Sequence, residues 1–385
     1  MRAPIHPLTS VLTETIIDLI DPRTSTKLRS LAVAANLDRS KRKNVGMNPE
    51  LRMSRPTLLS LAGELGVSRQ TISNVINNPE IVKPETRDRV RAAIASSGYR
   101  PSAAGRALRT QRSLSIALRL YQAVDGVNGT VMDRFVHSLA VAAQHEGYRI
   151  SLFAADSAGD EVAVIDGLHG ASAIDVAILT DTFTGDARPA GLLAARVPFV
   201  AFGRPWGERG DSHCWVDVDG SAGTEAATRS LRADGHTRIG YLGWPAGSGV
   251  GDDRRAGWAR AVGDLPDSGG LEMGVGDGAQ PGAEAAAILL ARGATALVCA
   301  SDSLALGALT VFRNLRANGR LPVVGFDDTP VARALGLSSV HQPVELAAER
   351  LIGMVADLLD GRTPPEPQQL LTPELVLREV APFAQ

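Results

Sequence analysis

Apolar residues near the start of the chain follow two helical periods separated by a short interruption. They recur at helical spacing from Leu58 to Leu65, stop at Gly66, and resume from Ile72 to Ile76. Gly66 suits a sharp turn because glycine adopts positive φ at little energetic cost. Ser68 precedes the second period and can cap it through its hydroxyl. The pattern predicts a helix-turn-helix.

The outward face of the second predicted helix is polar. Arginine can donate two hydrogen bonds to guanine, and glutamine or asparagine can pair with adenine. Short hydroxyl side chains suit phosphate oxygens, which fix position rather than sequence. An ordinary helical hairpin with a solvated polar face is the alternative. The residues that we expect to face DNA are Thr57, Ser68, Arg69, Gln70, Thr71, Ser73, Asn74 and Asn77.

Beyond residue 113 short apolar runs alternate with helical periods. This alternation predicts parallel sheets covered by helices on both faces. About 270 residues exceed what one such sheet needs, so we expect two lobes with a cleft, and ligands at the carboxyl ends of the strands. The predicted strands are Leu114–Leu120, Ile150–Ala154, Ala177–Leu179, Phe199–Phe202, Ile239–Leu242, Ala296–Cys299 and Val323–Phe326. The predicted helices are Asp133–Glu146, Thr224–Ala233, Arg254–Val262, Ala283–Ala291 and Leu304–Leu315.

Composition agrees with several domains in a chain of 385 residues that is 44% hydrophobic. Cys214 and Cys299 are far apart, so neither a disulfide framework nor a zinc site is indicated, and we expect no cofactor. No apolar run reaches the roughly 20 residues of a membrane span, and the first residues lack the apolar centre of a signal peptide. We therefore expect a cytoplasmic protein with no membrane partner.

Charge is distributed unevenly along the chain. Residues 54–112 hold ten Arg and Lys against four Asp and Glu, a net charge of +6. Residues 113–385 hold 21 Arg against 33 Asp and Glu, a net charge of −12. A basic head on an acidic body favours phosphate binding by one end of the chain only.

Several motifs occur in the order and spacing of one known family. They are TLLSLAGELGVSRQTISNVINN, VKPETRDRVRAAI, GYRPS and AGRALRT, followed in the body by RRAGW, ASDSLALGAL, VVGFDD, SSVHQP and LVLRE. Through them the chain resembles the lactose repressor/galactose repressor (LacI/GalR) family of bacterial transcriptional regulators, from about Thr57 to Pro382. The resemblance implies a small all-α helix-turn-helix head and a hinge, joined to an α/β body of two lobes with parallel sheets that is periplasmic-binding-protein-like.

The same resemblance implies a repressor that binds a palindromic operator in double-stranded DNA as a homodimer. A small sugar-like effector between the lobes would release it. We expect four parts: an N-terminal extension (1–53), the helix-turn-helix domain (54–101), the hinge (102–112) and the two-lobed effector-binding and dimerisation domain (113–385).

Residues for the effector follow from matching motif positions. Arg254 and Asp327 match the family's effector-binding arginine and aspartate, Ser301 lies where an asparagine is common, and Gln342 and Arg204 are further candidates. Arginine only donates and a carboxylate only accepts, so together they can orient vicinal hydroxyls. An ion pair across the cleft is the alternative for the first two.

Three further residues of the body each have a functional and a structural interpretation. Asp302 is an N-cap candidate for the helix expected to begin near Ser303. Trp206 and Trp244 could stack on a sugar ring, although tryptophan is at least as common in a core.

The hinge and the first 53 residues carry separate predictions. Leu108 occupies the position where the family inserts a leucine into the minor groove, and a plain linker is the alternative. Gly105 replaces a common alanine there, so the hinge helix should depend more strongly on DNA. Residues 1–53 predict partial disorder. We hypothesise that translation begins at Met53 or Met47, the alternative being an extension that adds DNA contacts through Arg39–Lys43.

Two other classes of protein fit less well. For an enzyme, the glycine-rich run 243–251 matches neither the dinucleotide nor the P-loop spacing, and no nucleophile elbow or metal-ligand cluster is present. A secreted sugar-binding protein would fit the body but not the basic head. The sequence therefore predicts a DNA-binding regulator and no enzymatic activity.

Overall fold

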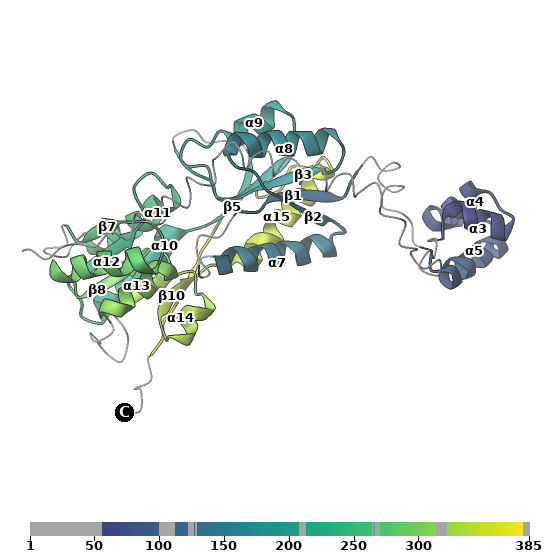
Figure 1. Cartoon of the computed structure of the whole chain (residues 1–385). Helices are drawn as coiled ribbons and strands as arrows, with labels where there is room; N and C mark the ends of the chain where they lie inside the picture. The colour runs from purple at the N-terminus through teal and green to yellow at the C-terminus, as the bar shows by residue number, and fades with distance from the viewer. Residues whose placement is uncertain are drawn as a thin grey trace, which may run out of the picture. The chain divides into compact units, whose positions relative to one another are not determined.

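The computed structural model describes residues 56–99, 112–121, 127, 129–207, 213–263, 265, 270–312 and 322–379. The chain divides into two units, residues 1–101 and 102–385, which we treat separately (Figure 1). The described part of the first is called the head and that of the second the body. The predictions for residues 1–53, Gly105 and Leu108 lie outside the described residues.

The head is a small helical unit around one apolar cluster. Leu61, Ile72, Val75 and Val90 are buried in it. Gly66 has φ +63° at the end of the first helix, which confirms the predicted turn. The helix-turn-helix prediction is confirmed. The elements are α3 (Leu58–Leu65), α4 (Arg69–Asn77), the 3-10 turn η3 (Pro79–Ile81) and α5 (Pro84–Ser97).

One lobe of the body, the N-lobe, is a parallel sheet with strand order β11-β5-β4-β3-β1-β2. Its strands are β1 (Ser115–Arg119), β2 (Arg149–Phe153), β3 (Val176–Leu179), β4 (Phe199–Phe202), β5 (Cys214–Val218) and β11 (Gln368–Leu371). Its helices are α7 (Gly129–His145), α8 (Ala158–Gly170), α9 (Arg188–Ala194) and α15 (Val344–Leu359).

Neighbouring residues of the N-lobe strands point to opposite faces of the sheet. Ile116 and Leu118 pack against the face that α7 and α15 cover. Ala117, between them, packs with Ile165 of α8 and Leu192 of α9 on the other face (Figure 1). Both faces are buried, as is usual for a parallel sheet.

The second lobe, the C-lobe, has strand order β12-β10-β9-β8-β6-β7. Its strands are β6 (Ile239–Gly243), β7 (Glu272–Gly274), β8 (Ala296–Cys299), β9 (Val323–Phe326), β10 (Ser338–His341) and β12 (Glu374–Val376). Its helices are α10 (Gly220–Ala233), α11 (Val250–Val262), α12 (Ala279–Ala291), α13 (Asp302–Phe312) and α14 (Pro330–Ala334).

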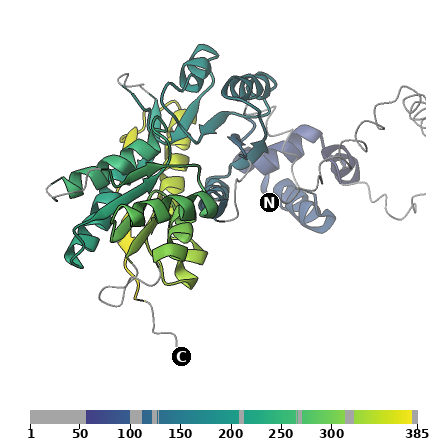
Figure 2. The ribbon, with the colours of Figure 1, turned by 60° about the vertical axis from the view of Figure 1, so that its left-hand side comes forward.

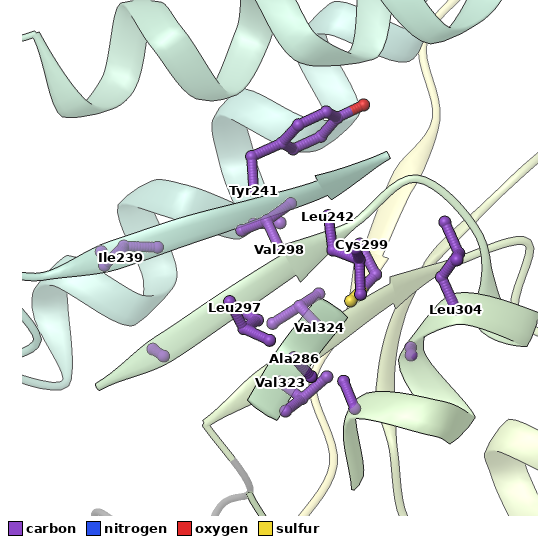
Figure 3. Packing of buried hydrophobic residues seen from close by; sticks show 14 of the residues in the cluster. Ile239, Tyr241, Leu242, Ala286, Leu297, Val298, Cys299, Leu304, Val323 and Val324 are labelled. Carbon is purple, nitrogen blue, oxygen red and sulfur yellow. The ribbon is translucent and has the colours of Figure 1, made fainter. Parts of the chain in front are cut away.

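The C-lobe core is centred on three apolar strands. Leu242 of β6 lies beside Cys299 of β8, and Leu297 of β8 lies beside Val323 of β9. Ala286 and Leu304 belong to the same buried cluster (Figure 3). α12 and α13 run next to each other in both views (Figures 1 and 2). The two helices can approach this closely because residue 307 is a glycine. A Cβ at that position would lie only 2.0 Å from the carbonyl oxygen of Ala279.

The chain passes between the lobes three times, from β5 to α10, from β10 to α15 and from β11 to β12. The predicted two-lobed α/β body with parallel sheets is confirmed. It departs from the prediction at one edge, where β12 pairs antiparallel with β10. No helix in the described residues combines the length and apolarity that crossing a bilayer requires.

Candidate functional site

The second helix of the head begins with a side-chain cap. The Ser68 hydroxyl accepts a hydrogen bond from the Thr71 backbone N–H at 3.0 Å, which confirms the predicted N-cap. Thr57 caps α3 in the same way and forms a capping box with Ser60. Ser68 and Thr57 therefore have structural roles in addition to the DNA contacts predicted for them.

The remaining predicted DNA-facing residues lie on α4. Gln70 Nε2 donates to Asn74 Oδ1 at 2.9 Å, so these two side chains support each other. Asn77 Nδ2 donates to the Ser73 carbonyl at 2.7 Å. By exposure the set divides into exposed Thr57, Ser68, Arg69, Gln70 and Asn77, and half-buried Thr71, Ser73 and Asn74.

Sequence reasoning gave no role to Arg89, which belongs to the framework of the head. Its Nη2 atom donates to the carbonyl of Leu65 at 2.7 Å, across 24 residues. That carbonyl lies in the last turn of α3, where no intrahelical donor is available. Part of the positive charge of the head therefore stabilises its fold.

The predicted effector residues of the C-lobe come together. Arg254, in the first turns of α11, and Asp327, directly after β9, are each 6% exposed. Arg254 Nη1 lies 3.9 Å from Asp327 Oδ1, and Gln342 Nε2 donates to the same oxygen at 2.6 Å. An ion pair between the two charged residues is thus present, and it is a long one.

The Arg254 guanidinium is enclosed but has few acceptors. It lies over the Phe326 ring, with Cζ 3.7 Å from the ring centroid, and Nη1 donates to the carbonyl of Ala300. A Cβ at position 220 would lie 2.9 Å from Arg254 Cγ, so the neighbouring helix must carry glycine there. Among the described residues the buried Nε of Arg254 has no hydrogen-bond partner.

Burial raises the pKa of Asp327 to about 7, although the Arg254 charge acts in the opposite direction. Asp302 and Asp277 are close enough to add to the rise, and the hydrogen bond from Gln342 opposes it. A carboxylate that is buried with so little compensation is a poor structural element and a suitable acceptor for an incoming hydroxyl.

Asp302 does not cap α13, so that interpretation is wrong. The helix begins at Asp302, and the Ser301 hydroxyl accepts from the Leu304 backbone N–H at 3.2 Å. Both carboxylate oxygens of Asp302 instead bind distant groups: Oδ2 accepts from the N–H and hydroxyl of Thr329, and Oδ1 accepts from the Ser339 hydroxyl at 2.7 Å. Asp302 therefore ties β10 and the start of α14 to α13.

Ser301 also takes part in the cluster around Arg254. Its hydroxyl donates to Asp277 Oδ1 at 2.5 Å, so it links the end of β8 to the segment after β7. Sequence reasoning did not identify Asp277. It follows β7, a short edge strand that the apolar pattern does not predict, so the sequence did not place Asp277 at a strand end.

Arg204 lies in the N-lobe and reaches the C-lobe. Its Nε is 3.1 Å from Asp217 Oδ2 on β5, and its Nη2 is 2.7 Å from Asp253 Oδ2 on α11. These ion pairs are close but poorly aligned for hydrogen bonding. Burial raises the pKa of Asp217 to about 6 and also raises that of Asp253. Arg204 therefore connects the two lobes beside Arg254.

Trp206 and Trp244 occupy different environments. Trp206 stacks with Arg204, whose Cζ lies 4.5 Å from the ring centroid, and its Nε1 donates to the Thr182 hydroxyl at 3.1 Å. Trp244 follows β6 and packs on the C-lobe core, with Arg254 Cζ 5.3 Å from its ring centroid. Trp206 is thus hydrogen-bonded in the N-lobe and also packs against Gly249, which precedes α11, whereas Trp244 contacts the Arg254 cluster.

Comparison with known proteins gives consistent matches for both units. Residues 57–102 match the family model described as "Bacterial regulatory proteins, lacI family", and residues 228–379 match "Periplasmic binding protein-like domain". The HTH-type transcriptional regulator CelR of Thermobifida fusca is 32% identical over 349 residues, which cover 85% of this chain and 99% of the relative. The regulator GalS of Salmonella typhimurium is 32% identical over 79% of this chain and 91% of its own.

Comparison with solved structures finds the same kind of protein. A complex of the transcriptional regulator CelR with cellobiose is 30% identical, with a TM-score of 0.61 over 85% of this chain and 100% of that chain. A lac repressor dimer bound to operator and the anti-inducer ONPF has a TM-score of 0.71 over 84% of this chain and 98% of its own. At 23% identity the second likeness concerns the fold alone.

Proposed function

Because the chain belongs to the LacI family of bacterial regulatory proteins, which are transcriptional regulators, we propose that it represses transcription from a near-palindromic operator. It binds the operator as a homodimer, and a small sugar-like effector held between the lobes releases it. Its relatives are transcriptional regulators rather than enzymes. We extend this to the chain itself, which acts in the cytoplasm on chromosomal DNA without catalysis and without a cofactor.

One observation carries the effector half of the proposal: among the described residues, the buried Nε of Arg254 has no acceptor, and the neighbouring buried carboxylate of Asp327 accepts from the Gln342 amide. Arg254 and Asp327 offer free donor and acceptor capacity, and Gln342 orients the carboxylate. A neutral polyhydroxyl ligand supplies both kinds of partner at once. Ser301 and Arg204 border this cluster, and the solved complex of the relative CelR with cellobiose supports a saccharide.

The DNA half of the proposal assigns base recognition to two side chains and phosphate contacts to the others. Arg69 and Gln70, exposed on α4, read base edges in the major groove. The hydroxyls and amides around them anchor phosphates, and Leu108 enters the minor groove. The phosphate anchors are Thr57, Ser68, Thr71, Ser73, Asn74 and Asn77.

The two halves are coupled through the state of the lobes. An effector can shift operator affinity only if it binds one arrangement of the lobes more tightly than the other. The ion pair of Arg204 in the N-lobe with Asp253 of α11 joins the two lobes, so it changes when the lobes move. The effector then acts on the spacing of the two DNA-binding heads of the dimer.

The test is selection of operators from random duplexes by the purified full chain, with and without cellobiose and other neutral saccharides. We expect one palindromic sequence, whose binding a saccharide weakens. Arg69→Ala should weaken that binding by about 1–3 kcal/mol and relax the preference at one base pair in each half-site.

Arg91→Ala is the matched control, because Arg91 is equally charged and exposed but lies on α5. It should weaken binding to all duplexes alike and leave the preference unchanged. Recovery of no preferred sequence under any condition would contradict the proposal.

A further inference from the structure

We propose that Trp244 belongs to the effector site and donates its indole N–H to the bound saccharide. This inference rests on the function proposed above and adds a ligand-binding residue to it. Within the described part of the chain, the Nε1 atom of Trp244 is buried and has no hydrogen-bond partner. An indole N–H can only donate, so its buried, unpaired state carries a desolvation penalty that an acceptor on a ligand removes.

The backbone around Trp244 fixes the position of this donor. Trp244 follows β6 directly, at the carboxyl end of a central strand. A Cβ at position 251 would lie 3.1 Å from Trp244 Cε3, and a Cβ at position 274 would lie 2.8 Å from the Trp244 carbonyl oxygen. The indole therefore packs against Gly251 of α11, and the backbone of Trp244 packs against Gly274 of β7, so both the ring and its attachment are closely enclosed.

A second unpaired donor lies beside it. Arg254 Cζ is 5.3 Å from the centroid of the Trp244 ring, and Arg254 Nε is also buried without a partner in the described residues. Two such donors on neighbouring side chains can serve one saccharide, whose hydroxyl and ring oxygens are acceptors. Asp327, whose Oδ1 lies 3.9 Å from Arg254 Nη1, adds an acceptor for a ligand hydroxyl. The class of ligand is therefore a neutral saccharide.

Two other indoles of the body show what a purely structural tryptophan does. Trp258 Nε1 donates to the Ile239 carbonyl at 3.1 Å, and Trp206 Nε1 donates to the Thr182 hydroxyl at 3.1 Å. Both are satisfied within the fold. Trp244 differs from them in its unpaired N–H, and a core role alone does not account for that difference.

The experiment compares Trp244→Phe with Trp258→Phe in the full chain. Phenylalanine keeps an aromatic ring and removes the N–H. Calorimetry with cellobiose, followed by other neutral disaccharides and monosaccharides, measures Kd, and thermal unfolding without ligand measures Tm. Trp244→Phe should weaken saccharide binding about tenfold and leave Tm unchanged or higher. Trp258→Phe should lower Tm and leave Kd of the folded protein unchanged.

Deoxy derivatives of the best-binding saccharide identify the atom that accepts the bond. One deoxy position should weaken binding to the wild type about tenfold and have no effect on Trp244→Phe, since the partner is already absent. Equal affinity of Trp244→Phe and wild type for every saccharide that binds would overturn the inference and leave the proposed function standing. Failure of all saccharides to bind the wild type would overturn both.

Discussion

The body buries one arginine in each lobe, and their surroundings differ. Arg188 in the N-lobe is 1% exposed, and every nitrogen of its guanidinium has an acceptor. The carboxylates of Glu161 and Asp186 lie 2.8 and 2.7 Å from it. Arg254 in the C-lobe is 6% exposed, and its nearest carboxylate, Asp327, lies 3.9 Å away.

Burial and charge therefore do not separate a structural site from a ligand site here, whereas hydrogen-bond saturation does. The N-lobe cluster holds its own charges in place: Arg119 also donates to Glu161, at 2.9 Å. The C-lobe cluster keeps donors and an acceptor in reserve at the strand ends. Unpaired buried donors and acceptors destabilise the ligand-free protein, and their pairing with a bound ligand contributes to binding affinity.

The strongest test of this comparison is Arg188→Met. Removal of the guanidinium leaves Glu161 and Asp186 buried without their main partner, so the free energy of unfolding of the body should fall by about 3–5 kcal/mol. Urea denaturation of the full chain measures it. Arg255→Met, which removes an exposed ion pair with Glu272, is the control and should change stability by less than about 1 kcal/mol. Similar losses of unfolding free energy in the two variants would show that the buried cluster around Arg188 is not a structural site.

Arg254→Met should affect effector binding much more than it affects stability. The ligand-free stability should change by about 1 kcal/mol or less, because few hydrogen bonds are lost and an unpaired donor is removed. Effector affinity should fall by about 10- to 100-fold, and operator affinity should stay unchanged. Urea denaturation, calorimetry and operator titration measure the three quantities. A loss of stability comparable to that of Arg188→Met would place Arg254 among the structural residues.

The smallest expected effect concerns pH. The folded-state pKa of Asp327, about 7, lies above its ordinary value of 3.8, so the folded protein binds more protons between these limits. Ligand-free stability should therefore fall as pH rises through this window, and stop falling above about pH 7. Asp327→Asn should remove the slope between about pH 6 and 7. The slope at lower pH should remain, because burial also raises the pKa of Asp217, to about 6. Thermal unfolding at a series of pH values measures both parts.

Six of the eight central strands of the body and the edge strand β2 could be predicted from sequence, whereas β5, β10 and the other three edge strands could not. β8 and β9 were predicted with the bounds they have, since strands buried on both faces read as continuous apolar runs. β7, β11 and β12 have three or four residues with polar positions among them. Only pairing with a neighbour that is distant in sequence makes them strands.

Helix starts show a similar limit. α10 was predicted from Thr224 but begins at Gly220, within a glycine-containing stretch whose propensity argues against a helix. The structure gives the reason: a Cβ at position 220 or 223 would approach the side chains of Arg254 and Val340 to 2.9 and 2.7 Å. Packing with residues far along the chain overrides local preference there.

The site was only partly readable from sequence. Arg254, Asp327 and Gln342 were identified by position in motifs, and the structure brings them together. The role of Asp302 was misread because its partners, Thr329 and Ser339, lie 27 and 37 residues further along the chain. No local pattern records such distances. The unpaired state of Trp244 likewise emerges only when all its neighbours are in place.

The threefold passage between the lobes has a consequence for the nascent chain. The N-lobe sheet is nearly complete once β5 has been made, but one of its faces is covered by α15, whose Val344, Ala347 and Leu351 are buried. At roughly 5–20 residues per second, the ribosome needs on the order of ten seconds or more to supply that helix. Through this interval all of the C-lobe except β12 is synthesised beside an exposed apolar surface, so chaperones should bind this protein there first.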